Sequence, residues 1–188
     1  MVLYTGKGDK GDTYVFDTPK GKRISKTSVL VEALGALDEL NSICGVCKIK
    51  AQTSGIYIGA EMPSLEHILH EMQENLFIVQ AELAGAPKCL AGEKVRDLER
   101  ITTAIEAELP PITTFFVPGG TELSAFLDVA RTTARRIERR IVAVREAALR
   151  EVGDETLAYL NRLSSALYAC ARYANYAVGV EEDAPEYE

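Results

Sequence analysis

The chain has 188 residues and a formal net charge of −7, and 47% of its residues are hydrophobic. This length suits about one domain with a substantial core, and the apolar share is typical of a packed globule rather than a disordered chain. The negative charge argues against general affinity for nucleic acids or anionic membranes, because the summed field repels polyanions.

No stretch of the sequence is suited to crossing a membrane. The longest run without a charged residue, 109–121, has 13 residues and contains three prolines. A membrane-spanning helix needs about 20 consecutive apolar residues. The chain reaches Gly6 and Lys7 before an apolar run forms, so no secretory signal is expected. The predicted location is therefore the cytoplasm.

After residue 27, hydrophobic residues recur at steps of three and four, which predicts amphipathic helices. Five such segments run from about 28 to 49, 65 to 83, 95 to 109, 123 to 148 and 157 to 178. Thr121 is a predicted N-cap of the fourth helix, and Gly85 and Gly153 are predicted stops of the second and fourth. Because these helices must bury their apolar stripes against one another, the sequence predicts an all-α bundle of five helices. One domain is expected over 1–188, with 181–188 as a mobile acidic tail.

Two segments lack helical periodicity and are expected to be loops that carry function. The second of them, 110–120, contains Phe115 and Phe116. The first, 4–25, is rich in glycine and lysine, and its residues 6–11 match the spacing of a dinucleotide-binding fingerprint. That fingerprint acts between a strand and a helix, and no helix is predicted before residue 27, so the match is rejected. Two interpretations stay open: glycine N–H groups and lysines that bind a phosphate, or a flexible basic arm.

Seven of the twelve arginines lie between residues 131 and 150, in and just after the fourth predicted helix. Arg131, Arg135 and Arg139 are four residues apart and form one ridge beside the apolar stripe, with Glu138 on the same side. Arginines at the border of a buried face are suited to binding phosphate or carboxylate groups. The alternative is a solvated face of ion pairs. That alternative is expected to hold for two arginines beside the ridge, Arg136 and Arg140.

Two further patterns are interpreted as structural. Cys44 and Cys47 have the spacing of a redox motif, but both continue the apolar stripe of the first predicted helix, which favours core packing. His67 and His70 lie near two glutamates on the polar face of the second helix. Two histidines without a third partner favour solvated side chains over a metal site.

Several separated segments together resemble one family, the PduO-type ATP:cob(I)alamin adenosyltransferases. They read YTGKGDKGDT, SK, VEALGALDELNS, FFVPGG, ARTTARRIERR and LNRLS, at 4–13, 25–26, 31–42, 115–120, 130–140 and 160–164. The resemblance spans nearly the whole chain in order. Several motifs at compatible spacing are more specific than any one of them.

The resemblance implies an enzyme that transfers the 5′-deoxyadenosyl group of ATP to the cobalt of cob(I)alamin, giving adenosylcobalamin and triphosphate. It also implies a ferritin-like five-helix bundle assembled as a homotrimer, in which Mg-ATP binds between the N-terminal residues 1–26 of one subunit and the arginine-rich helix of its neighbour. Besides further copies of the chain, ATP and the corrinoid, a reductase is a candidate partner. The family's nucleotide-binding positions correspond to Thr5, Gly6, Lys7, Gly8, Thr13, Tyr14, Lys26, Arg135, Arg136, Glu138, Arg139 and Asn161.

The resemblance also implies roles for single residues. Glu138 would help to hold magnesium, and Arg131 would pair across the subunit interface with Asp38. Phe115 would face the corrin, where this aromatic residue is associated with displacing the lower cobalt ligand to leave four-coordinate cob(II)alamin. The expected catalytic set is Arg135, Phe115, Arg131 and Asp38. The chemistry agrees, because Co(I) is itself the nucleophile and the enzyme has only to stabilise the charge of the departing triphosphate.

The N-terminal segment departs from the family pattern. Gly6 and Lys7 stand where the family usually has a basic residue followed by a hydroxyl residue or glycine. Asp12 stands where a small or hydroxylic residue is common, and residues 18–22 resemble an insertion that lengthens the loop. Two alternatives to the enzyme remain open. One is a helical scaffold whose arginines bind an acidic protein or RNA; the other is a nucleotide-binding regulator without corrinoid turnover.

Overall fold

The computed structural model describes residues 3–59 and 62–187, which form five α-helices and one short pair of strands. The helices are α1 (Val29–Ser54), α2 (Leu65–Leu83), α3 (Gly92–Glu108), α4 (Glu122–Glu146) and α5 (Asp154–Tyr176). The predicted all-α five-helix bundle is therefore confirmed. Within the described residues, no helix is long and apolar enough to cross a membrane.

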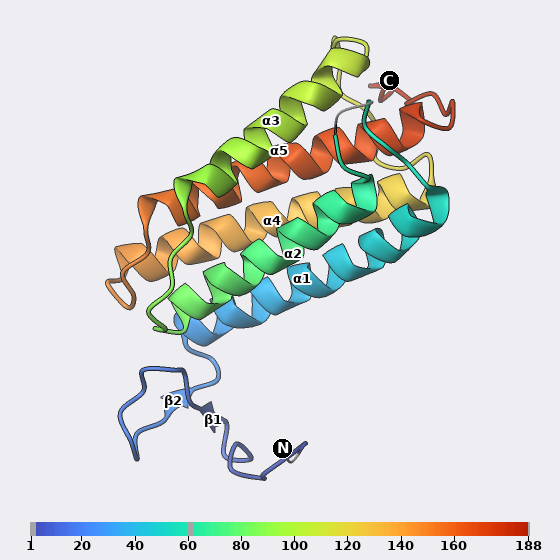
Figure 1. Cartoon of the computed structure of the whole chain (residues 1–188). Helices are drawn as coiled ribbons and strands as arrows, with labels where there is room; N and C mark the ends of the chain where they lie inside the picture. The colour runs from blue at the N-terminus through green and yellow to red at the C-terminus, as the bar shows by residue number, and fades with distance from the viewer. Residues whose placement is uncertain (1–2, 60–61, 188) are drawn as a thin grey trace.

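Successive helices run in opposite directions along the bundle (Figure 1). α4 packs against both α1 and α5, while α2 packs on α1 and α3 packs on α5. The N-terminal segment, residues 3–28, lies below the end of the bundle where α1 begins and α4 turns into α5. The loop 110–120 and the end of α5 lie at the opposite end, so one chain holds its two irregular segments far apart.

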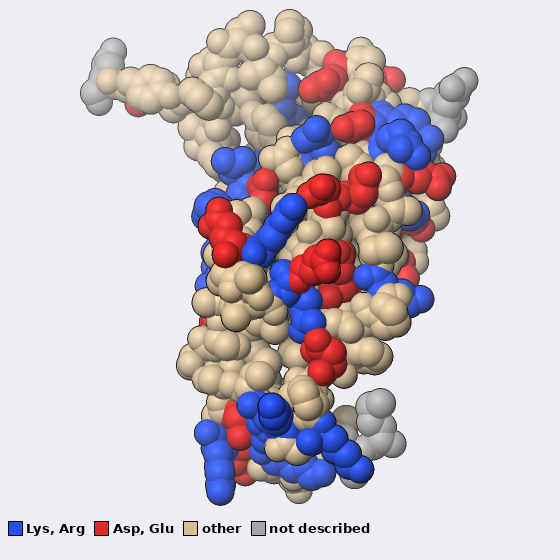
Figure 2. All heavy atoms as spheres, turned by 90° about the vertical axis from the view of Figure 1, so that its left-hand side faces the viewer, with Lys and Arg blue, Asp and Glu red and all other residues tan. Residues whose placement is uncertain are grey.

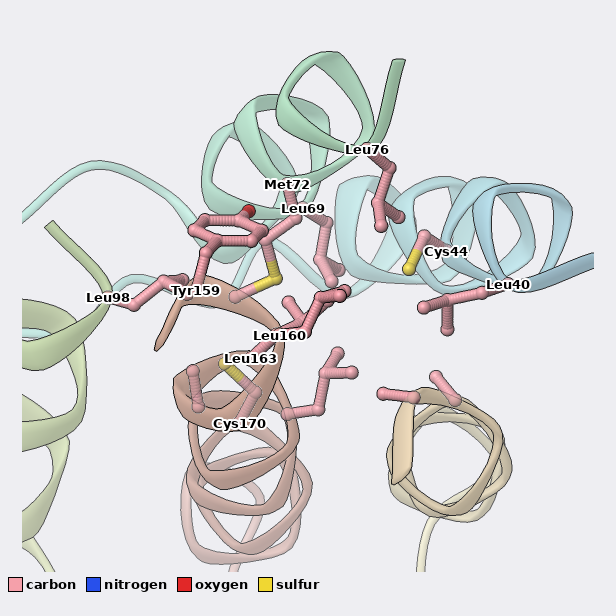
Figure 3. Packing of buried hydrophobic residues seen from close by; sticks show 14 of the residues in the cluster. Leu40, Cys44, Leu69, Met72, Leu76, Leu98, Tyr159, Leu160, Leu163 and Cys170 are labelled. Carbon is pink, nitrogen blue, oxygen red and sulfur yellow. The ribbon is translucent and has the colours of Figure 1, made fainter. Parts of the chain in front are cut away.

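The core is built from the apolar stripes that the hydrophobic spacing predicted. Buried side chains from all five helices form one cluster, and Figure 3 shows Leu40 and Cys44 of α1 and Leu69 of α2 converging on Leu160 of α5. Burying one leucine side chain stabilises a fold by about 1.5–3 kcal/mol. Tyr159 is also fully buried, and this burial raises the pKa of its hydroxyl.

Hydrogen bonds and backbone angles define where the helices begin and end, and one predicted helix end is wrong. The Thr121 hydroxyl accepts from the Ser124 N–H at 3.1 Å, which confirms the predicted N-cap. Gly85 follows α2 with a φ of 91°, as expected for a helix stop. α4, however, ends at Glu146 rather than near Gly153. Gly153 is instead the N-cap of α5, and its N–H donates to Glu82 Oε1 at 2.8 Å.

The N-terminal segment has a structure that the periodicity did not predict. β1 (Asp12–Thr13) pairs antiparallel with β2 (Ile24–Ser25). Lys26 closes the preceding glycine-rich loop, because its N–H donates to the Gly11 carbonyl and its Nζ donates to the Gly8 carbonyl, both at 2.9 Å. The glycine-rich residues therefore form a closed loop attached to a small hairpin.

The acidic residues after α5, expected to form a mobile tail, make contacts in their described part. Glu182 accepts a hydrogen bond from Arg172 Nε at 2.8 Å, and the Arg172 side chain is only 6% exposed. The Asp183 carbonyl accepts from the Val117 N–H at 2.8 Å. These bonds connect the end of the chain to α5 and to the loop 110–120.

We expect the native protein to react with a thiol reagent at one of its four cysteines. Cys89 is exposed, whereas Cys44, Cys47 and Cys170 are buried. Burial raises the pKa of each of the three buried thiols to about 12, so almost none is present as the reactive thiolate at neutral pH. A chromogenic disulfide should therefore consume one equivalent rapidly, and four after denaturation. Cys89→Ser should remove the rapid phase; a second rapid equivalent would contradict core packing of Cys44 and Cys47.

Candidate functional site

Acidic partners divide the seven arginines of 131–150 into two groups. Five contact a carboxylate within ion-pair distance: Arg131, Arg136, Arg140, Arg145 and Arg150. The ion pairs expected for Arg136 and Arg140 are confirmed, with Glu39 and Glu32 of α1 at 2.6 and 3.3 Å. Arg135 and Arg139 contact no carboxylate in the described part of the chain, and Arg139 donates only to the Arg135 carbonyl, at 3.0 Å. These two guanidinium groups are the ones available to bind a phosphate.

A cavity of about 820 Å³ opens beside α4 and α5. Its volume falls in the range of small-molecule sites, roughly 300–1,000 Å³. The lining combines aromatic and apolar side chains of the loop 110–120 with polar and cationic groups of the two helices. The residues are Ile112, Thr113, Thr114, Phe115, Phe116, Arg131, Arg135, Ser164, Ser165, Tyr168 and Tyr187. Burial raises the pKa of Tyr168, so its hydroxyl is neutral at physiological pH.

The orientation of Arg131 is set within its own chain. Its Nε donates to Asp128 Oδ1 at 2.8 Å, and its guanidinium carbon lies 5.5 Å from the centroid of the Tyr168 ring. Asp128 is three residues earlier on the same helix and therefore lies on the same side. Asp38, predicted to pair with Arg131 of a neighbouring subunit, is exposed on α1.

A second hollow, of about 570 Å³, lies between the N-terminal segment and the bundle. It is lined by Thr13 and Lys26 from the segment and by Arg136 of α4, together with residues of α1. Next to it, the Arg23 guanidinium carbon lies 4.3 Å from the centroid of the Tyr14 ring. Thr13, Lys26 and Arg136 are thus three predicted nucleotide-binding residues that one chain brings together.

Glu138 and Asn161 are also brought together. Asn161 Nδ2 donates to Glu138 Oε1 at 2.9 Å, while Arg162 donates to Asn161 Oδ1 at 2.6 Å. The second carboxylate oxygen of Glu138 has no hydrogen-bond partner among residues 3–59 and 62–187. This oxygen is left free to contact water or a bound group.

One chain does not bring all the predicted site residues together. Thr5, Gly6 and Lys7 are exposed in the N-terminal segment, where the Lys7 N–H lies 3.4 Å from the Thr5 hydroxyl oxygen. Phe115 lies in the loop at the other end of the bundle (Figure 1). A site that uses both the glycine-rich loop and the aromatic cavity must therefore combine two copies of the chain.

A family model described as cobalamin adenosyltransferase matches residues 3–174. The chain belongs to this family. The match includes the glycine-rich loop, the hairpin, all of α4 and most of α5, so the predicted resemblance is confirmed over nearly the whole chain.

Two members of the cobalamin adenosyltransferase family are similar to this chain over nearly their full length. A corrinoid adenosyltransferase of Bacillus subtilis is 37% identical over 190 residues, covering 100% of this chain and 93% of the relative. One from Citrobacter freundii is 38% identical over 192 residues, covering 98% and 97%. A solved structure, a variant PduO-type ATP:corrinoid adenosyltransferase from Lactobacillus reuteri complexed with cobalamin and ATP, has a TM-score of 0.84. It is 30% identical and the match covers 98% of this chain and 99% of that one.

Several cavity residues of this cobalamin adenosyltransferase were not singled out from the sequence. One of them is Tyr168, which recurs with Asn161 and Ser165 at steps of four and three, so that all three lie on one face of α5. This helical spacing could have identified Tyr168 as a candidate site residue. Tyr187 lies beyond the helices, and no local pattern marks it as a cavity residue.

Proposed function

We propose that this chain is a corrinoid adenosyltransferase, which transfers the 5′-deoxyadenosyl group of ATP to the cobalt of cob(I)alamin and releases triphosphate. The observation that carries the proposal is the composition of the cavity. Arg135, a cation without a carboxylate partner in the described chain, lines the same cavity as Phe115 and Phe116. The polyphosphate of ATP needs a cationic surface, and a reduced corrin macrocycle needs an apolar surface next to it.

The reaction requires charge stabilisation more than acid–base catalysis. Co(I) attacks C5′ of ATP, the cobalt supplies both electrons of the new Co–C bond, and the electrons of the broken C5′–O bond leave with the triphosphate. The protein therefore supplies no nucleophile. Its contribution is fixed donors for the developing negative charge, and Arg135 and Arg139 are such donors. An apolar wall at Phe115 excludes water from the reacting atoms.

We place ATP between the N-terminal segment of one subunit and α4 of a neighbour in a homotrimer. This arrangement would bring Lys26 and the glycine N–H groups of one copy next to Arg135 and Arg139 of another. Phe77, which is 58% exposed beside Val31 and Leu34 in a hollow of about 580 Å³, offers an apolar face for such contact. The proposed nucleotide contacts are Thr5, Gly6, Lys7, Gly8, Thr13, Tyr14, Lys26, Arg135, Arg136, Glu138, Arg139 and Asn161.

Glu138 fits the proposed magnesium ion. Mg²⁺ is usually held by one or two carboxylates, with phosphate oxygens and water completing the octahedron. Asn161 fixes one oxygen of Glu138 and leaves the other free, as a single-carboxylate site requires. Bound there, the ion would neutralise part of the triphosphate charge.

Phe115, which is 79% exposed in the cavity, is proposed to face the corrin and to favour the four-coordinate cobalt state. Arg131 and Asp38 are proposed to pair between subunits and so to connect this wall with the neighbouring copy. A reductase that supplies Co(I) is the further partner of this scheme.

Purified protein mixed with Mg-ATP and chemically reduced cobalamin provides the direct test. We expect the absorption spectrum of adenosylcobalamin, with one free triphosphate for each cobalamin converted. Tight ATP binding without a Co–C product would instead identify a nucleotide-binding regulator.

Phe115→Ala should separate the corrinoid side of the site from the nucleotide side. Loss of the apolar wall should lower the adenosylation rate by about 100-fold, a cost typical of a misplaced reacting group. ATP affinity, measured by calorimetry, should stay within about twofold of wild type, because the ring is not a proposed nucleotide contact. Tyr57→Ala is the matched control, since it removes an aromatic ring that is 65% exposed outside the cavity. Equal rates for the two variants would remove Phe115 from the mechanism.

A further inference from the structure

A two-pronged ion pair attaches the N-terminal segment to the end of the bundle. Arg150, between α4 and α5, donates from both terminal nitrogens to the two carboxylate oxygens of Asp17, and the Nη2–Oδ1 distance is 2.9 Å. Its Nε donates to the Leu83 carbonyl at the end of α2, at 3.0 Å. The Arg150 side chain is only 16% exposed. One guanidinium thus joins three segments that are distant in sequence.

The Asp17 carboxylate is presented by a rigid turn. The Val15 N–H donates to the Thr18 hydroxyl at 2.9 Å, and the Thr18 N–H donates back to the Val15 carbonyl at 3.0 Å. Val15 also packs against the hydrophobic core. Hydrogen bonds from Arg150 lower the pKa of Asp17, so the carboxylate stays ionised at neutral pH.

Gly85 provides the space for this contact. Its φ of 91° lies in the region that favours glycine, and a β-carbon there would lie 2.5 Å from Asp17 Cγ and 2.8 Å from Arg150 Nη1. The end of α2 is therefore shaped to let the Asp17 carboxylate approach Arg150. A residue with a side chain at this position would displace the ion pair, so Gly85 supports the same junction.

The junction is connected to the glycine-rich loop through the hairpin. Asp12 and Thr13 pair with Ser25 and Ile24, and Lys26, the next residue, donates to the Gly8 carbonyl. Residues 3–28 carry six basic and three acidic side chains. Figure 2 accordingly shows Lys and Arg side chains gathered at the lower end of the molecule. This is the end at which Figure 1 shows the N-terminal segment. Without an anchor, such a cationic segment would sample many positions.

We propose that Asp17 and Arg150 are positioning residues, which hold the N-terminal segment where its glycine-rich loop and Lys26 can receive the polyphosphate of ATP. The inference rests on the proposed function for the identity of the ligand. Neither residue touches the nucleotide in this scheme. They act by keeping the segment in its binding-competent position, so their loss raises the Kd for ATP in inverse proportion to the fraction of time that the segment stays in place.

Asp17→Asn removes the charge and one acceptor while keeping the size of the side chain. Hydrogen–deuterium exchange of peptides covering 12–28 should become faster. The Kd and KM for ATP should rise about tenfold, as expected if the segment is in place about one-tenth of the time. The kcat at saturating ATP and the KM for the corrinoid should stay close to wild type. Asp17→Glu, which keeps the carboxylate, should recover part of the loss.

Asp154→Asn is the matched control, because it removes another aspartate–arginine pair, with Arg145 at 2.8 Å, at the same end of the bundle. It should leave exchange in 12–28 and ATP affinity unchanged. Unchanged exchange in Asp17→Asn would overturn the anchor, and faster exchange with unchanged ATP affinity would overturn the positioning role. Exchange and ATP binding are read without turnover, so failure of wild type to adenosylate cobalamin would count only against the proposed function.

Discussion

Arg135→Ala should lower kcat/KM for adenosylation by about 100- to 1,000-fold, the usual cost of deleting one preorganised donor, about 2.7–4 kcal/mol. Arg135 lines the cavity and contacts no carboxylate in the described chain, so its charge is available to the departing triphosphate. Steady-state kinetics with chemically reduced cobalamin measures the effect. Unfolding by urea should be nearly unchanged, because no intrachain ion pair is lost.

Arg145→Ala is the control for this prediction. Arg145 lies in the last turn of the same helix, but it contacts Asp154 at 2.8 Å and lies outside the cavity. An exposed ion pair of this kind contributes less than about 1 kcal/mol. Near-normal turnover of Arg135→Ala, or an equal loss in Arg145→Ala, would show that the cavity arginine has no special role.

Leu160→Ala should destabilise the fold by about 2–5 kcal/mol, because it removes buried methyl groups and leaves a cavity in the core. Leu160 is 0% exposed and lies in the middle of the cluster drawn in Figure 3. Urea unfolding at a fixed protein concentration gives the change in free energy. The melting temperature should fall by roughly 2–4 °C for each kcal/mol lost.

Leu149→Ala is the matched control for the core. This leucine is 48% exposed in the turn after α4, so the same deletion should cost about 0.5 kcal/mol or less. Equal destabilisation by the two substitutions would contradict the packing of α5 at the centre of the bundle.

The helices were predictable because each buries one stripe that repeats at the helical period. Leu65, Leu69 and Leu76 show this for α2, which begins and ends where the spacing indicated. The N-cap of α5 was not predictable in the same way. Gly153 takes this position, and its N–H donates to Glu82, which is 71 residues away in the sequence. Local patterns carry no information about a partner so far along the chain.

The candidate site was likewise predictable where it depends on local spacing, and not where it depends on contacts distant in sequence. The separation of Arg135 from Arg136 and Arg140 was predicted from their angles on one helix, and the ion pairs to α1 confirm it for the last two. The anchor between Asp17 and Arg150 joins residues 133 apart. The sequence alone does not indicate this contact, because it forms only where the fold packs the N-terminal segment against the end of α2.

In the proposed enzyme, one active site uses the N-terminal segment of one chain and α4 of another. Lys26→Ala and Arg135→Ala, each expected to be nearly inactive alone, should be refolded together as a 1:1 mixture. About one interface in four then combines an intact segment with an intact α4, so the mixture should regain up to about a quarter of wild-type adenosylation. Activity no higher than that of the separate variants would contradict a site shared between chains.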